Sequence, residues 1–214
     1  MTIRLNGSTS GYAQLDSAAV GGNNTLVLPT TNGTANQALV TDGSGTLSFA
    51  DRGRMVLATA QNSTSGTSID FTGIPSWVKR VTVMFDGVST NGTSPPQIQI
   101  GDSGGIETTG YICSNSVIVA SVGTANFTTG FGIGVSTGQW GATRVVGGSI
   151  ALTLLNLATN TWSASGSVGS SDITAMYVTA GAKSLSATLD RVRITTVNGT
   201  DTFDAGSINI LYEG

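Results

Sequence analysis

Short segments in which apolar and polar residues alternate, separated by turn residues, run through most of this sequence. Residues 207–212 show the pattern, since Ile208, Ile210 and Tyr212 would lie on one face of an extended segment. A period of two is that of a β-strand with one buried face. No segment has a convincing helical period, and Lys and Glu, which favour helices, are scarce. The sequence therefore predicts an all-β fold.

From residue 55 onward the alternating segments and their turns are typical of a β-sandwich or jelly-roll-like domain. The alternation slips once, near Asp190 and Arg191, where we predict a β-bulge. Trp77 alternates with Val81, Val83 and Phe85, so we expect it in the core, and we expect Trp162 to be packed in a strand. The longest turn-rich connections, predicted as loops, are 89–96, 102–110, 123–130 and 137–144. The predicted strands are 55–61, 68–71, 77–85, 97–100, 111–120, 131–136, 145–157, 161–167, 173–179, 187–197 and 207–212.

Residues 1–54 form a segment of a different kind. Asn-Gly, Asp-Gly and similar turns separate very short predicted strands at 12–15, 24–28, 37–41 and 46–49. Its large apolar side chains are too few to offset the conformational entropy lost when the segment orders by itself. We therefore expect residues 1–54 to be a stalk or arm buried against other chains, followed by a sandwich domain over residues 55–214.

The composition removes the commonest catalytic and metal-binding chemistry. Histidine is absent and Cys113 is the only cysteine, so neither a Ser–His–Asp triad nor a zinc site is available. We interpret Cys113 as a buried, inert thiol. The glycine-rich residues 130–134 lack the helix that follows a phosphate-binding loop, and we interpret them as a strand or bend.

The acidic residues also give no sign of a catalytic site, because most of them lie beside Gly, Ser or Thr, where Asp stabilises turns. Residues 42–45 and 102–105 could offer oxygens to calcium, but they lack the spacing of a calcium loop and are interpreted as plain turns. We expect no enzyme activity and no cofactor. A polysaccharide depolymerase with paired carboxylates is the weakest of the alternatives.

Charge and hydropathy limit the partners. The formal net charge is −3 and the basic residues are scattered, so we expect no nucleic-acid binding. The start of the chain lacks the apolar core of a signal peptide. The most apolar run, residues 149–157, is far shorter than a membrane-spanning helix, and we expect no membrane insertion. These features favour synthesis in a reducing cytoplasm.

One predicted loop, 137–144, combines an aromatic residue with hydrogen-bonding neighbours. Trp140 could stack on a sugar ring or a protein surface, while Gln139 and Arg144 could bind polar groups of the same partner. The alternative is that Trp140 folds back onto the sheet. Gln139, Trp140 and Arg144 are the candidate receptor or partner contact, and no catalytic, metal or cofactor residues are predicted.

Residues 21–49 carry a recognisable succession of elements: Asn24–Thr25–Leu26–Val27–Leu28–Pro29, an Asn-Gly turn, Gln37–Ala38–Leu39–Val40–Thr41–Asp42–Gly43, and then Leu47–Ser48–Phe49. This pattern resembles a module of fibre and appendage proteins of tailed bacteriophages, especially marine and cyanobacterial ones. The second half of the chain resembles the C-terminal β domains of similar virion proteins more loosely.

The resemblance implies a homotrimer that belongs to the virion, is assembled in the host cytoplasm and contacts other virion proteins. One hypothesis is a short trimeric fibre or spike, attached through its N-terminal segment, that binds a host-surface glycan or protein. The alternative is a protein that decorates or cements the capsid.

Overall fold

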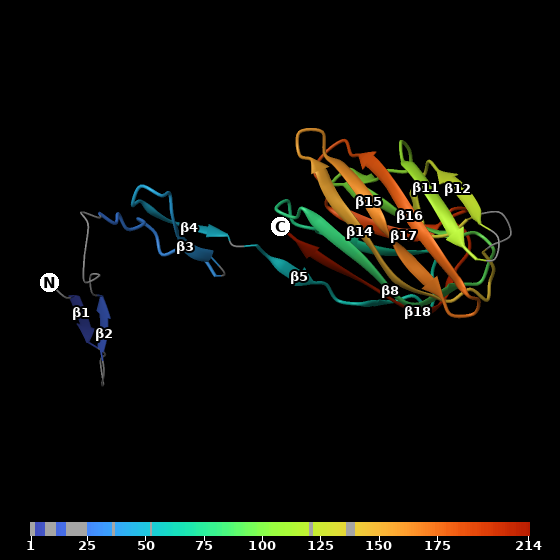
Figure 1. The fold of residues 1–214 in the computed structure, drawn as a ribbon, viewed down its shortest axis with the longest axis horizontal. Helices are drawn as coiled ribbons and strands as arrows, with labels where there is room; N and C mark the ends of the chain where they lie inside the picture. The colour runs from blue at the N-terminus through green and yellow to red at the C-terminus, as the bar shows by residue number, and fades with distance from the viewer. Residues whose placement is uncertain are drawn as a thin grey trace. The chain divides into compact units, whose positions relative to one another are not determined.

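The computed structural model describes residues 3–6, 12–15, 25–35, 37–51, 53–119, 122–135 and 140–214. Every helix or strand that it assigns within these residues is a β-strand, and all pairings between the strands are antiparallel. The all-β prediction is confirmed for this part of the chain. The protein divides into two compact units, Met1–Arg52 and Gly53–Gly214, which are described separately (Figure 1).

The first unit contains two hairpins. β1 (Ile3–Asn6) pairs with β2 (Tyr12–Leu15), and β3 (Gln37–Thr41) pairs with β4 (Leu47–Asp51). The turn of the second hairpin is held by the Asp42 carboxylate, which accepts hydrogen bonds from the backbone N–H groups of Ser44 and Thr46 at 2.7 and 3.1 Å. The strand predicted at 24–28 shrinks to a single bridge between Val27 and Thr46.

Apolar side chains of this unit lie open to solvent. Leu26, Val27 and Leu28 are 66%, 53% and 72% exposed, and Leu39 is 48% exposed. A folded segment that leaves successive large aliphatic side chains in water gains little from the hydrophobic effect. Within the described part of this unit, these four side chains gain little from burial in their own chain, whereas Val40, Leu47 and Phe49 are half-buried.

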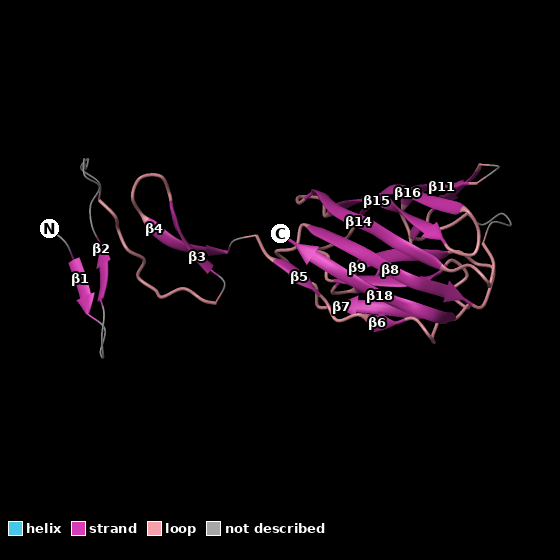
Figure 2. Ribbon diagram, turned by 60° about the horizontal axis from the view of Figure 1, so that its bottom comes forward, coloured by secondary structure: helices cyan, strands magenta, loops and turns pink. Residues whose placement is uncertain are grey.

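The second unit is a β-sandwich, as predicted, and the larger of its two sheets has nine strands (Figure 2). The order across it is β12-β11-β16-β15-β14-β8-β18-β5, and β6 also pairs with β18. The strands are β5 (Met55–Leu57), β6 (Gln61–Asn62), β8 (Arg80–Thr90), β11 (Ile112–Ile118), β12 (Gly123–Phe127), β14 (Val146–Asn156), β15 (Thr161–Ser170), β16 (Ala175–Ser184) and β18 (Phe203–Glu213).

The smaller sheet has five strands in the order β10-β9-β17-β7, with β13 also paired to β9. Its strands are β7 (Ser68–Thr72), β9 (Pro96–Asp102), β10 (Gly105–Ile106), β13 (Phe131–Gly132) and β17 (Arg191–Thr196). Alternation along β17 places Val192 and Ile194 inside and Arg191 and Arg193 outside.

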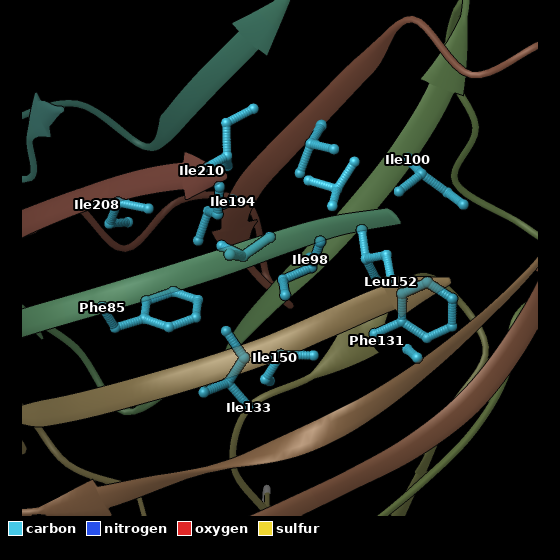
Figure 3. Packing of buried hydrophobic residues seen from close by; sticks show 14 of the residues in the cluster. Phe85, Ile98, Ile100, Phe131, Ile133, Ile150, Leu152, Ile194, Ile208 and Ile210 are labelled. Carbon is cyan, nitrogen blue, oxygen red and sulfur yellow. The ribbon is translucent and has the colours of Figure 1, made fainter. Parts of the chain in front are cut away.

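The two sheets share one apolar layer (Figure 3). From the large sheet, Phe85, Ile150, Leu152, Ile208 and Ile210 point inward, and each is at most 5% exposed. They meet fully buried side chains of the small sheet, and one from the segment after β13: Ile98, Ile100, Ile194, Phe131 and Ile133. Apart from Leu152, these inward residues are β-branched or aromatic, and they fill the space between two pleated surfaces.

Most predicted strands of the second unit are present, but four details are corrected. Residues 123–130, predicted as a loop, contain β12, and residues 102–110 contain the short β10. Residues 185–190 are not a strand, so the slip predicted as a bulge near Asp190 and Arg191 marks the place where β17 begins, at Arg191. Trp77 precedes β8 and is half-buried against Tyr212, 5.8 Å away between ring centroids, whereas Trp162 is packed in β15 as predicted.

Register shifts occur instead in β14 and β18. They coincide with glycines of positive φ, 141° at Gly148 and 89° at Gly206. A Cβ atom on Gly206 would lie 2.4 Å from the carbonyl oxygen of Gly87 in β8. A side chain at residue 206 would therefore separate the two strands.

A polar network joins the sheets where β11 begins and β16 ends. The Tyr111 hydroxyl accepts a hydrogen bond from the Ile100 N–H at 2.8 Å, and it lies 2.9 Å from the carbonyl oxygen of Glu107, to which it can donate. The Lys183 ammonium, 7% exposed, pairs with the Glu107 carboxylate, which also accepts the Ser186 N–H at 2.7 Å. These contacts connect β16 of the large sheet to the segment that follows β10 of the small one.

The network sets the ionisation of Glu107. Burial acts to raise the pKa of this carboxyl, but the hydrogen bonds from Lys183 and Ser186 outweigh it, so its pKa lies below the ordinary value of 4.5. A carboxylate whose pKa is lowered by folding stabilises the protein above its unfolded-state pKa. That stability is lost as the pH falls through the lower folded-state pKa.

We therefore predict that Glu107→Gln lowers the free energy of unfolding by about 1–3 kcal/mol at pH 7, because the Lys183 ammonium loses its charged partner. Urea denaturation of the wild type and the variant should show this difference at pH 7. The difference should begin to narrow below pH 4.5, where the unfolded chain takes up the proton, and should vanish below the lower folded-state pKa, where the native carboxyl is also protonated.

The matched control is Glu213→Gln. Glu213 pairs with Arg80 at 3.2 Å, but the Arg80 side chain is 51% exposed, and such a surface pair contributes little. An equal loss of stability in the two variants, or a Glu107→Gln difference that does not depend on pH, would contradict the role given to the network.

Candidate functional site

Of the three residues that the sequence grouped as a candidate contact, the structure describes Trp140 and Arg144. Gln139 lies outside the described residues. Trp140 is only 4% exposed and belongs to the apolar core. The Arg144 side chain is 11% exposed and is engaged by an acidic partner.

Trp140 packs on the inner side of the large sheet. Its ring lies 5.7 Å from that of Tyr177 in β16, with an interplanar angle of 54°, and its Nε1–H donates to the Thr90 hydroxyl at 3.3 Å. On another side it lies against Gly134, where an added Cβ would come within 2.8 Å of the indole. The tryptophan therefore fills a space between β8, β16 and the segment after β13.

Arg144, just before β14, is joined by an ion pair to the turn between β15 and β16 of the same sheet. Its guanidinium lies 2.6 Å from the Asp172 carboxylate, which also accepts the Val145 N–H at 3.4 Å and the Ser170 hydroxyl. Burial acts to raise the pKa of Asp172, but these hydrogen bonds and the Arg144 charge outweigh it, so the pKa lies below its usual range. The pair fastens residues 144–145 beside the β15–β16 turn.

The stacking hypothesis for Trp140 is therefore corrected, because a ring that is 4% exposed offers no face to a sugar or a partner. The alternative, an aromatic residue that folds back onto the sheet, describes what the structure contains. Residues 140–144 are held by packing and an ion pair, and they position the loop rather than present a contact.

Beneath Trp140, the glycine-rich residues 130–134 form a bend with the short strand β13, as interpreted from the sequence. Asn115, 2% exposed, donates from Nδ2 to the carbonyl oxygens of Gly132 and Gly134, and the Thr179 hydroxyl donates to the first of these at 2.7 Å. The Cys113 thiol donates to the Asn115 Oδ1 at 3.1 Å, and burial raises its pKa. The segment is a packing element, and the buried thiol is poorly placed to ionise.

The outer side of the small sheet carries a polar groove of about 340 Å³. The Arg193 guanidinium makes a two-pronged contact with the Asp70 carboxylate, both distances being 2.7 Å. Beside the pair, Gln99 donates to the Thr129 carbonyl oxygen at 2.8 Å, and Thr195 donates to the Thr67 carbonyl oxygen at 2.8 Å. Among the described residues that line this groove there is no aromatic ring, so its chemistry is that of amide, hydroxyl and guanidinium groups.

The two turns considered for calcium use their carboxylates within the protein. Asp42 is occupied by its own turn, and Asp102 accepts the Gly104 N–H at 2.7 Å and the Ser186 hydroxyl. These hydrogen bonds lower the pKa of both carboxyls. Within the ranges that the structure describes, no three His, Cys, Asp or Glu residues gather as a metal-binding group.

We predict that Trp140→Ala lowers the free energy of unfolding by about 3–5 kcal/mol, because it opens a cavity between the sheet and the glycine-rich bend. Thermal unfolding should show a midpoint on the order of ten degrees lower. Ser103→Ala, on the exposed turn between β9 and β10, is the control and should leave the midpoint nearly unchanged. A Trp140→Ala protein as stable as the wild type would place the ring outside the core.

Comparisons with known proteins assign neither a family nor a fold relative to this chain. Neither the protein-family models, nor the curated proteins, nor the solved structures contain a match to this chain. In the described part of the chain there is also no helix long and apolar enough to cross a membrane.

Proposed function

We propose that this protein is a non-enzymatic structural component of a tailed-phage virion, a short trimeric fibre or spike. Residues 1–54 serve as the stalk or arm that attaches to other virion proteins, and residues 55–214 form the jelly-roll-like domain that faces outward. The resemblance of residues 21–49 to modules of virion appendage proteins supports a place in a phage particle. The structure of the first unit supports a role in assembly.

The observation that carries the assembly role is the exposure of Leu26, Val27 and Leu28. Within residues 25–51, hydrogen bonds fix a defined backbone: the Val27 N–H donates to the Gly45 carbonyl oxygen at 2.9 Å, and the Leu47 N–H donates to the Val27 carbonyl oxygen at 2.8 Å. An ordered backbone that presents aliphatic side chains to water is suited to being covered by other chains. Three copies of the segment, or one copy and a virion protein, supply that cover.

The second candidate, a capsid decoration protein, is favoured by the burial of Trp140. A fibre needs a receptor contact, and the residue expected to provide it packs inside the domain. A decoration protein requires no such contact. In the fibre hypothesis, the polar groove beside Arg193 is the surface available for the hydroxyl groups of a host glycan.

The position and copy number of the protein in purified phage particles test the proposal. We expect peptides of this chain in the particle, at tens of copies for a fibre, with density at the tail in a reconstruction. Hundreds of copies spread over the head would establish the decoration alternative. Particles that lack the protein altogether would overturn both.

A second prediction concerns the first unit. Leu28→Asp should weaken the association of the full-length chain by about tenfold or more, because a carboxylate would be buried where an aliphatic group is expected. Sedimentation equilibrium measures the change, and circular dichroism should show an unchanged fold for residues 53–214. Thr31→Asp adds the same charge at a nearby exposed turn and should leave the association intact. A wild-type chain that is monomeric over the whole concentration range would refute the trimer.

A further inference from the structure

The outer face of the large sheet has an unusual chemistry for a solvent-exposed surface. Alternation turns Val81 and Val83 of β8 into the core, so that Thr82 and Met84 point outward, and the same holds for the neighbouring strands. Figure 1 shows β18, β8, β14, β15, β16 and β11 crossing this face next to one another, in agreement with the strand pairings. The outward residues of these six strands line up in rows.

The strand register gives the two central rows, and neither contains a charged residue. One row consists of Leu211, Thr82, Ala151, Ser165, Ala180 and Ser114. The next consists of Asn209, Met84, Ser149, Ser167, Val178 and Ser116. We call these two rows the neutral face.

Charge returns only at the margins of the neutral face, within the part of the sheet that the structure describes. In one flanking row Arg80 is paired with Glu213, and in the other stands Asp86. Toward the β11 side the flanking rows become apolar instead: Ile112 is 78% exposed, Ile118 54% and Met176 46%. The opposite surface of the sandwich differs, because Asp70, Arg191 and Arg193 stand on the outside of the small sheet.

The neutral face together with its two flanking rows is close to the size of a protein interface. With strands about 4.8 Å apart and residues rising about 3.3 Å each, the two rows of the neutral face cover roughly 29 by 13 Å over six strands, or about 380 Å². The flanking rows, which hold Arg80, Glu213 and Asp86, bring this surface to about 750 Å². A stable complex of standard size buries about 800 Å² on each partner. The side chains of the neutral face are mostly Ser, Thr and Ala, so the surface is flat enough for another sheet to pack at about 10 Å.

We infer that the neutral face binds other copies of this same chain, so that the sandwich domains pack together through their large sheets. A surface without charge meets its own copy without like-charge repulsion, whereas it offers no charge by which a different partner could be selected. The inference rests on the proposed trimer and adds a second interface to it. The small sheets then point outward, with the polar groove accessible.

Cysteine labelling of the full-length protein tests this arrangement. Ser165→Cys places a thiol at the centre of the neutral face, and Thr72→Cys places one on the exposed outer side of the small sheet. We expect a maleimide to label residue 165 at least about tenfold more slowly than residue 72 in the oligomer. The wild type, in which Cys113 is buried, provides the background rate.

A charge on the same face gives an independent measurement. Thr82→Glu should weaken association in sedimentation equilibrium by about tenfold or more, because the new carboxylate would be buried and would face its own copies. Thr72→Glu, the same substitution beside Arg191 on the small sheet, should leave association unchanged. Circular dichroism checks that both variants fold, and the Ser165→Cys experiment decides the matter if Thr82→Glu does not.

The outcomes separate this inference from the trimer itself. An oligomer in which residue 165 labels as fast as residue 72, and in which Thr82→Glu has no effect, would overturn the inference and leave association through the first unit. A monomeric wild-type chain would overturn both. Slow labelling of residue 165 together with weakened association of Thr82→Glu would establish the neutral face as the interface between copies.

Discussion

The sandwich depends on one constraint: two sheets must close over a single apolar layer. Val83, Ile150 and Ile210 from three adjacent strands of the large sheet have no exposed surface or almost none, and Ile98 and Ile194 meet them from the small sheet. Hydrogen bonds within each sheet fix the strands in register, and this layer is the main contact that holds the sheets to one another. The Glu107–Lys183 network adds a directional connection at one end. The residues that point outward from the two sheets do not contribute to this core.

The outward residues differ in chemistry between the two surfaces of the domain. The small sheet places an arginine–carboxylate pair and amide groups outside, whereas the large sheet places small neutral side chains there. A surface committed to water ordinarily carries charges, since they keep a protein soluble. The asymmetry is the basis on which we assign one surface to association and leave the other accessible.

Local patterns predicted the strands well and the loops poorly, for physical reasons. Trp162 alternates with other inward residues of its strand, so its burial follows from a period of two. Trp140 stands outside any period, and its burial depends on contacts with Thr90 and Gly134 that no local pattern contains. β12 was missed because it pairs with β11 alone, at the sheet edge, where polar Thr124 and Asn126 can replace apolar residues. The neutral face likewise appears only when the register aligns six strands.

The glycine-rich bend beneath Trp140 also bears on how such a protein can evolve. An added Cβ on Gly132 would lie 2.5 Å from the Phe127 ring, and one on Gly130 would lie 2.6 Å from the Gln97 amide oxygen. A larger residue at position 132 therefore requires the Phe127 ring to move, and one at position 130 requires the Gln97 side chain to move and lies 3.0 Å from the Ile98 carbonyl oxygen. Outward residues of the small sheet, such as Thr72, carry no comparable restriction. We expect descendants of this sequence to keep the bend almost unaltered while the outer side of the small sheet diverges, so that the bend would be the better marker of common ancestry.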